Sequence, residues 1–271
     1  GSGSGNVATN GAPTFKSAFE RNGKFQVNGS LWDYYSSDAN KGYKRTTHST
    51  GKGVTGVHTI GDIPFSKVDA DQGSSFAEYG DAAIVVLSRL GGEGSDLPRG
   101  TKALNSLKDV DGILGDSTEG DVLKLSPIEK DLLKGLKAKK EAGVFKSVVV
   151  ILNFANQIEA DFITDAEYGV DAALWIGTPG LAGLYGVADL ISGDVNPSAK
   201  LSTTFWRNHK LNPAVTNFNV SVYADSPDGF YEDGSPNQDR VYSVYQEGVY
   251  LGYKYTESRY FDFVEGKHNA G

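Results

Sequence analysis

Three short runs of apolar residues stand out along the chain and predict buried β-strands. They are "DAAIVVLS" (81–88), "FKSVVVILN" (145–153) and "DAALWIG" (171–177). Their central residues are apolar almost without interruption, which is typical of strands covered on both faces. A fourth run, "KLSTTFW" (200–206), is a weaker candidate for a further strand.

Segments with helical periodicity alternate with these strands. In "LSPIEKDLLKGLKAKKEAG" (125–143), apolar residues recur on one face, and the segment opens with Ser126, Pro127 and Glu129. Ser126 fits an N-cap, Pro127 the first helical position and Glu129 the third position of a capping box, while Gly143 ends the pattern. Further helices are predicted in 12–23, 27–38 and 181–192, the last carrying Leu181, Leu184, Ala188 and Ile191.

The alternation of apolar strands with helices predicts the fold class. We expect an α/β three-layer sandwich, in which helices cover both faces of a mostly parallel sheet. Residues 37–75 are polar and weakly periodic, so we expect a long surface excursion with at most one short strand. The segment 207–271 is irregular and rich in aromatic residues, and it either packs on the edge of the sheet or covers a neighbouring surface.

In an open parallel sheet, ligands bind in the loops that follow the carboxyl ends of the strands. By this rule "GGEGSD" (91–96), "NFANQ" (153–157) and "GTPG" (177–180) lie along one functional edge. Asn153 and Asn156 are candidates for contacts with a ligand there, although both residues also fit structural roles in a turn.

Composition and charge exclude several classes of protein. The net charge is −8 and no block of Lys and Arg occurs, so the chain lacks the basic stripe of a nucleic-acid-binding protein. There is no cysteine, which removes disulfides and Cys-based zinc sites. No apolar run approaches the roughly 18 residues of a transmembrane helix, and no signal peptide is visible. We therefore expect no membrane partner, and neither a cytoplasmic nor a secreted location is favoured.

Of the catalytic and binding sites considered, the sequence favours one built on a single carboxylate. A phosphate site in "GGEGSD" is disfavoured because Glu93 and Asp96 would repel a phosphate, and no GxGxxG motif occurs. The four histidines are scattered, so no metal site is expected, and the GxSxG motif of a serine hydrolase is absent. Glu93 on its glycine-rich loop remains as a candidate general acid, tuned or oriented by Arg89 and Asp96. The residue types alone leave an ordinary polar loop open as the alternative.

Several motifs in a fixed order resemble one known family. These are "AIVVLSRLGGEGSDLP", "KSVVVILNFANQIEADF", "VDAALWIGTPGLAGLYGVADLISGDVNPSAKLSTTF" and "YQEGVYLGYKY". Together they are similar to the second domain of family-3 glycoside hydrolases, the β-glucosidases and β-xylosidases, over roughly residues 80–271. The resemblance implies an α/β sandwich of six strands in which Glu93 is the general acid/base of a retaining enzyme acting on terminal β-D-glucosides or related β-glycosides. It implies no cofactor.

The resemblance also implies what lies outside this sequence. The nucleophile of the family is an aspartate on a separate TIM-barrel domain, and nothing in these 271 residues matches it. We therefore expect 1–271 to be a single α/β domain whose first strand is missing, with the barrel of the parent enzyme as its partner. On this interpretation Arg89 and Asp96 contribute to substrate binding around Glu93. The alternative is a non-catalytic carbohydrate-binding or scaffolding domain of the same fold.

Overall fold

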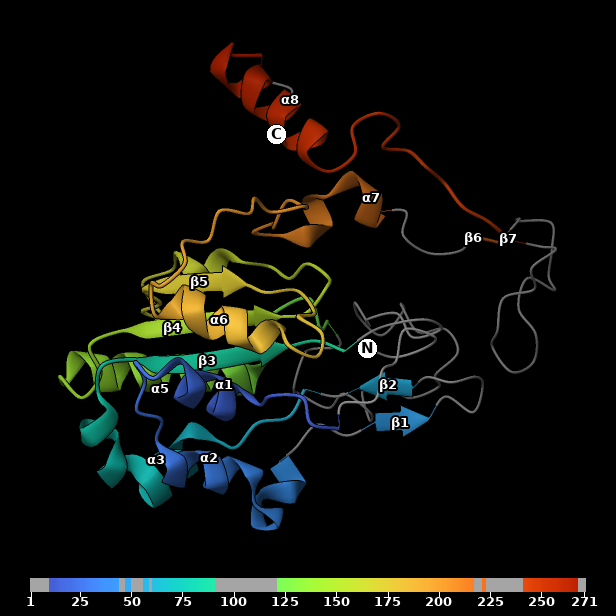
Figure 1. The fold of residues 1–271 in the computed structure, drawn as a ribbon. Helices are drawn as coiled ribbons and strands as arrows, with labels where there is room; N and C mark the ends of the chain where they lie inside the picture. The colour runs from blue at the N-terminus through green and yellow to red at the C-terminus, as the bar shows by residue number, and fades with distance from the viewer. Residues whose placement is uncertain are drawn as a thin grey trace.

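A three-stranded parallel sheet forms the centre of the protein. The computed structural model describes residues 10–43, 47–49, 56–58, 60–90, 121–216, 221–222 and 241–267. The strands lie in the order β3-β4-β5, with bounds β3 (Ala83–Ser88), β4 (Val148–Asn153) and β5 (Ala172–Trp175). All three strands that the apolar runs predict are confirmed, and both pairings are parallel (Figure 1).

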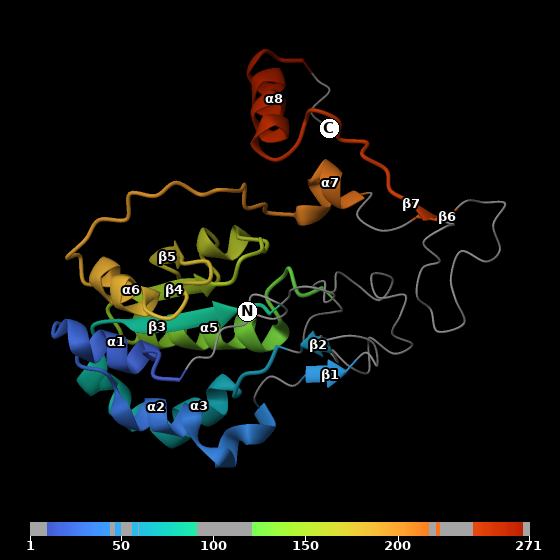
Figure 2. The same cartoon turned by 45° about the vertical axis from the view of Figure 1, so that its right-hand side comes forward.

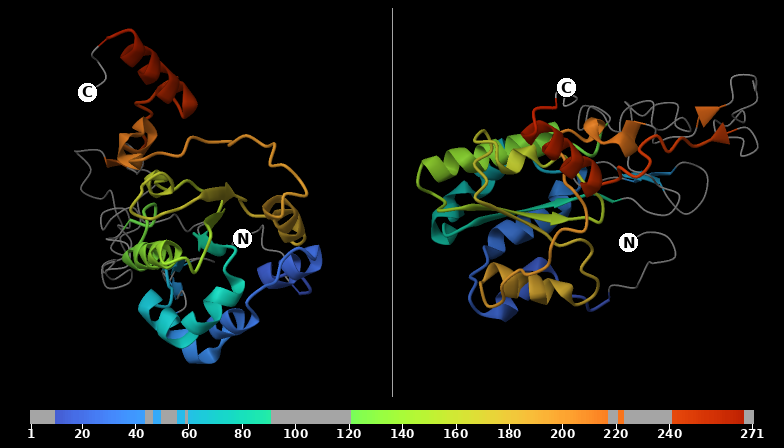
Figure 3. Two further views of the ribbon diagram at one scale, coloured as in Figure 1. Left: turned by 90° about the vertical axis from the view of Figure 1, so that its left-hand side faces the viewer. Right: turned by 90° about the horizontal axis from the view of Figure 1, so that it is seen from above.

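Helices lie on both sides of this sheet because alternate strand residues point to opposite faces. Val85 and Val150 pack with α5 (Pro127–Glu141) and α3 (Phe65–Gln72). Ile151 points the other way and packs with α1 (Phe15–Asn22) and α6 (Gly183–Ile191). The end-on view in Figure 3 shows α5 on one side of the strands and the pair α1 and α6 on the other. The described residues therefore form a mixed α/β fold around an all-parallel sheet.

The start of α5 confirms the predicted capping pattern. The Ser126 hydroxyl accepts the backbone amide of Glu129, and the Glu129 carboxylate accepts the backbone amide of Ser126. Pro127 occupies the first turn, where its missing N–H costs nothing. Leu132, Leu133 and Leu136 are buried against the sheet, so the periodicity located the correct face.

The prediction of an irregular excursion over 37–75 is wrong. After α2 (Gly29–Ser36), the chain forms η2 (Asp38–Tyr43), the antiparallel pair β1 (Thr47–Ser49) and β2 (Gly56–His58), α3, and η3 (Gly73–Tyr79). Phe65, Val68 and Phe76 are buried in the main core. A few large apolar side chains at helical spacing are enough to attach this polar stretch to α5.

The predicted strand at 200–206 is also wrong. These residues are irregular, and Leu201 at the start of the run is 59% exposed. The chain is tied to the core at Trp206, whose carbonyl accepts the amide of Ala160 at 2.9 Å. It continues through η7 (His209–Leu211), α7 (Pro213–Thr216) and the short antiparallel pair β6 (Ser221–Val222) and β7 (Val241–Tyr242).

The described C-terminal residues do not pack on the sheet, so this part of the expectation is wrong as well. The helix α8 (Tyr253–Val264) has no buried residue, and neither core cluster includes a residue from 241–267. Figure 2 shows α8 standing apart from the sheet, close to α7. Charged residues interrupt the aromatic ones along α8, which leaves no continuous apolar stripe for a core. None of the described helices combines the length and apolar character needed to cross a lipid bilayer.

Candidate functional site

The carboxyl ends of the three strands are level with one another, as the sequence predicts for a functional edge. Ser88 at the end of β3 is in register with Asn153 at the end of β4. Leu152 of β4 is in register with Trp175, the last residue of β5. The indole Nε1 of Trp175 donates to the carbonyl of Phe154 at 2.6 Å, which joins the end of β5 to the loop that follows β4.

Two of the three predicted site residues, Glu93 and Asp96, lie outside the described residues. Arg89 is described, directly after β3, and it is buried. Of these three residues, the structure therefore describes only Arg89, where β3 ends.

The Arg89 guanidinium is held by an extensive set of hydrogen bonds. Nε donates to Val122 O at 2.6 Å, and Nη2 donates to Lys124 O at 2.9 Å. Nη1 donates to Ser88 O at 2.9 Å. Nη1 and Nη2 also donate to the two carboxylate oxygens of Glu129, at 2.7 and 2.9 Å. These bonds match the five N–H donors of a guanidinium.

Glu129 therefore has two structural roles. One carboxylate caps the amino end of α5 and forms a bidentate ion pair with Arg89. Both side chains are nearly excluded from water. The sequence predicted the cap but gave no signal for the ion pair, since nothing local links Glu129 to Arg89.

A second buried polar cluster lies beside this one, around His209. The imidazole Nδ1 is 2.8 Å from Glu159 Oε1, and Nε2 is 3.2 Å from Asp121 Oδ2. The backbone amide of His209 also donates to Glu159 Oε1, at 3.1 Å. All three residues are buried. In the sequence, nothing distinguishes His209 from the other three histidines.

The environment of His209 favours its charged form. The hydrogen bond to Asp121 raises the pKa of the imidazole above its usual value, burial opposes this rise, and Glu159 adds to it. Burial pulls the pKa of the Asp121 carboxyl upward, but the hydrogen bond and charge of His209 outweigh it and the pKa is lowered. Both ring nitrogens are engaged by carboxylates, and among the described residues no group of side chains is arranged to hold a metal ion.

The two clusters meet on one short stretch, residues 121–124. Arg89 binds the carbonyls of Val122 and Lys124 from the end of β3. From the other side, the amide of Glu159 donates to Leu123 O at 2.7 Å. The amide of Leu123 in turn donates to the carboxylate of Asp121 at 3.1 Å. The chain is thus fixed at both points that bracket residues 91–120.

Of the two candidate asparagines, Asn153 is the last residue of β4 and Asn156 lies in the loop that follows. The Asn156 amide nitrogen donates to the carbonyl of Gln157 at 2.6 Å, which is a local turn contact. Gln157 in turn donates to the hydroxyl of Thr203 at 2.6 Å. For Asn156 this geometry favours the structural role over a ligand contact.

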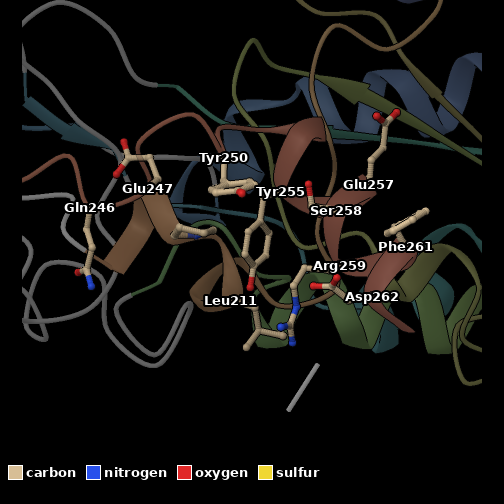
Figure 4. Close-up of a pocket in the computed structure, with 11 residues that line it drawn as sticks. Leu211, Gln246, Glu247, Tyr250, Tyr255, Glu257, Ser258, Arg259, Phe261 and Asp262 are labelled. Atoms are coloured by element: carbon tan, nitrogen blue, oxygen red, sulfur yellow. The ribbon is translucent and has the colours of Figure 1, made fainter. Parts of the chain in front are cut away.

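A cavity of about 860 Å³ lies elsewhere, in the C-terminal segment (Figure 4). Its lining includes aromatic and charged side chains, among them Tyr250, Tyr255, Glu247, Arg259 and Asp262. One carboxylate oxygen of Glu247 is buried and has no hydrogen-bond partner among the described residues. Arg89, the one predicted catalytic or substrate-binding residue that is described, does not line this cavity.

Comparison with known families gives one match over most of the chain. A family model described as the glycosyl hydrolase family 3 C-terminal domain matches residues 1–253. The match includes the glycine-serine opening, "GSGSGNV" (1–7), and the following residues up to 79. All of these lie before residues 80–271, where the sequence motifs carry the resemblance. It ends at the start of α8.

Individual relatives are β-glucosidases much longer than this chain. The chain is 30% identical over 191 residues to β-glucosidase A of Butyrivibrio fibrisolvens, an alignment covering 67% of this chain and 19% of that protein. It is 26% identical over 182 residues to a β-glucosidase of Ruminococcus albus, covering 67% of this chain and 14% of the relative. The solved structure of a Paenibacillus barengoltzii β-glucosidase matches 97% of this chain and 23% of its own length, with a TM-score of 0.66 at 24% identity.

Proposed function

The chain belongs to glycoside hydrolase family 3, as the C-terminal domain of a β-glucosidase-like protein, and from this premise we propose that it supplies the general acid/base of a retaining β-glycosidase. The observation that carries the proposal is the match to the family across 1–253, which includes the "GEG" sequence around Glu93. Glu93 follows β3 by a few residues, and β3 ends level with β4 at the edge where parallel sheets place their ligands.

In this proposal Glu93 acts twice. It first protonates the departing glycosidic oxygen while an aspartate of the barrel domain attacks the anomeric carbon. It then removes a proton from the water that breaks the glycosyl-enzyme bond. The chain contributes one of the two carboxyl groups that a retaining glycosidase places about 5–5.5 Å apart. We therefore expect the chain without the barrel to hydrolyse no glycoside.

The other proposed site residues have supporting roles. Arg89 uses its guanidinium donors on Ser88, Glu129 and the stretch 121–124, which supports a role in anchoring the Glu93 segment more than in binding sugar. Asp96 is proposed to orient or tune Glu93 from its position three residues later. The substrate class, terminal β-D-glucosides, rests on the names of the relatives, and the barrel domain of the longer enzyme is the proposed partner.

The proposed fold of the complete domain goes beyond the described sheet. We expect the three described strands to belong to a larger sandwich, and the whole of 1–271 to act as a single domain. Its first strand would precede the glycine-serine opening in the longer enzyme.

The experiment compares Glu93→Ala with the unchanged full-length enzyme on aryl β-glucosides of different leaving-group ability. General acid catalysis contributes about 10²–10⁴-fold, and poor leaving groups depend on it most. We expect a loss in that range in kcat/KM, which reports the glycosylation step, on poor leaving groups and a much smaller loss in kcat/KM on activated aryl glucosides. Glu141→Ala, which removes an exposed carboxylate on α5, is the matched control. Equal rates for Glu93→Ala and the unchanged enzyme on both substrates would remove Glu93 from the mechanism.

A second candidate function, carbohydrate binding without catalysis, is favoured by the C-terminal cavity. Tyr250 and Tyr255 line the cavity with aromatic side chains, and Glu247 and Asp262 add carboxylates, which accept hydrogen bonds from sugar hydroxyls. Calorimetric titration with cellobiose tests this: Tyr255→Ala should abolish binding, whereas Tyr245→Ala, at an 80% exposed position outside the cavity lining, should not. Absence of binding by the unchanged protein would remove this candidate.

A further inference from the structure

The C-terminal segment, residues 207–271, is attached to the α/β core with very little apolar burial. Among its residues whose burial the structure describes, His209 is the only buried one. Leu211, two residues later on η7, is 64% exposed, and α8 has no buried residue. The two core clusters include no described residue after Phe205. The described part of the segment therefore depends mainly on polar contacts for its place beside the core.

These polar contacts converge on His209. Its imidazole Nδ1 lies 2.8 Å from Glu159 Oε1, and its Nε2 lies 3.2 Å from Asp121 Oδ2. Its backbone amide also donates to Glu159 Oε1, at 3.1 Å. Both carboxylates belong to the core, because their chain neighbours Val122 and Ile158 are each 1% exposed. One side chain of η7 thus bridges two separate parts of the core.

The charges around this ring balance when the imidazole is protonated. The further charged group that faces the cluster, among the described residues, is Lys124, whose ammonium group lies 4.0 Å from Glu159 Oε2. The imidazolium and the ammonium group together match the two carboxylates. A neutral imidazole leaves one negative charge unmatched, and it turns a lone pair toward one of the carboxylate oxygens because it has a single N–H. A buried charge that loses its partner is strongly unfavourable, so deprotonation weakens the contact.

The elements that follow His209 are linked to η7. Leu211 of η7 and Pro213 of α7 line the same cavity as Tyr255 of α8 (Figure 4). The Tyr255 ring also lies 5.9 Å, between centroids, from the ring of Trp206, three residues before His209. Figure 2 shows the chain running as an extended stretch from α6 to α7, with α8 close by. A movement of η7 away from the core would therefore carry α7 and α8 with it.

We propose that His209 is a pH-sensitive switch that holds η7, and with it α7 and α8, beside the α/β core when charged and releases them when it loses its proton. The hydrogen bond to Asp121 raises the pKa of the imidazole, burial opposes this rise, and Glu159 adds to it, so the attached state extends above the usual range of a histidine. Opening changes the position of the C-terminal cavity relative to the core. The switch goes beyond the proposed acid/base function and does not depend on it.

Amide hydrogen exchange in the full-length enzyme between about pH 5.5 and about pH 9 tests the switch. The reporters are the amide of His209, which donates to Glu159, and the amide of Ala160, which donates to Trp206 O at 2.9 Å. We expect their protection, corrected for the intrinsic exchange rate, to fall by up to about tenfold per pH unit from about pH 6.5 to the folded pKa of His209, and then to level off.

A reference amide in the sheet distinguishes this opening from unfolding of the whole domain. The amide of Ile176 donates to Leu152 O at 3.0 Å, between the ends of β5 and β4. Because the switch opens without disrupting the sheet, Ile176 should keep at least about a hundredfold more protection than the two reporters at every pH. Equal protection at all three amides would mean that the segment opens only when the fold unfolds, which contradicts the inference.

Two variants test whether the titration belongs to this cluster. His209→Gln carries no charge at any pH, so the pH dependence of protection at Ala160 should disappear. Asp121→Asn removes the largest cause of the raised pKa, so the fall in protection should be smaller and should end at a lower pH. The matched control is Glu141→Gln, which removes an exposed carboxylate on α5 and should leave the pH profile unchanged.

The outcomes decide the proposal in each case. Reporter protection that does not change with pH in the unchanged enzyme overturns the switch. The same pH profile in His209→Gln assigns the titration to another group and overturns it as well. If His209→Gln does not fold, Asp121→Asn decides, because a profile equal to that of Glu141→Gln contradicts the role of the cluster. None of these results involves Glu93, so failure of the switch leaves the proposed function standing.

Discussion

Arg89 and Glu129 face each other through two nearly parallel hydrogen bonds of 2.7 and 2.9 Å, and water reaches almost none of either side chain. The pair joins the end of β3 to the start of α5. The same Glu129 carboxylate also caps α5. Removing it would therefore affect both the start of this helix and the edge of the sheet. This contact connects the stability of the fold to the geometry of the candidate site.

Breaking this pair should destabilise the protein strongly. Glu129→Gln leaves the Arg89 charge buried and unpaired, and removal of one partner of a buried pair typically costs about 3–5 kcal/mol. Urea denaturation should show this loss. Glu141→Gln, which breaks an exposed pair with Lys137 on the same helix, should change the free energy of unfolding by less than about 1 kcal/mol. Similar small changes for both variants would show that the buried pair is not important for stability.

The stability of the protein should depend on the charge of His209. The pKa of this imidazole is raised in the folded state, mainly by Asp121. Its stabilising contribution is therefore complete below about pH 6.5, the unfolded value, and is lost as the pH rises through the folded pKa. The difference in unfolding free energy between the unchanged protein and His209→Gln should shrink over that range. A difference that is constant between acidic and alkaline pH would contradict the charge assignment.

Replacing Gly135 in α5 by alanine should destabilise the protein. A Cβ at this position in α5 would lie 2.0 Å from Cδ1 of Phe65, a buried ring that cannot easily move. Gly135→Ala should therefore lower the melting temperature, although alanine is favoured over glycine in helices by about 1 kcal/mol. At Gly186 in α6 a Cβ would meet nothing within 4 Å, so Gly186→Ala should raise the melting temperature. A gain in stability for Gly135→Ala would mean that α3 does not pack on α5 as described.

The sequence predicted best those features that depend on neighbouring residues. The apolar runs located β3, β4 and β5, and Ser126, Pro127 and Glu129 located the start of α5. It failed for α3, where Phe65 and Val68 are the buried residues of an otherwise polar helix. Such a segment becomes helical because it packs on another element, and local periodicity carries little of that information.

The same difference between local and long-range information applies to the candidate site. Glu93 was predicted from its glycine-rich loop after a buried strand and from the family resemblance, and its role stays a prediction because residue 93 lies outside the described residues. His209 was missed because its partner Glu159 is 50 residues away in the chain, and Asp121 is still farther. A lone histidine in a sequence gives no indication that two distant carboxylates will meet it. Arg89 was predicted as a site residue, whereas its ion pair with Glu129, which the sequence did not predict, became visible only in the fold.

Azide tests whether Glu93 is the acid/base of a retaining glycosidase. In the full-length Glu93→Ala enzyme acting on an activated aryl β-glucoside, azide should displace the enzyme carboxylate from the anomeric carbon without needing a base. We predict that added azide raises the turnover rate and that the product is the β-glucosyl azide. A rate unaffected by azide, with glucose as the sole product, would contradict the assignment of Glu93.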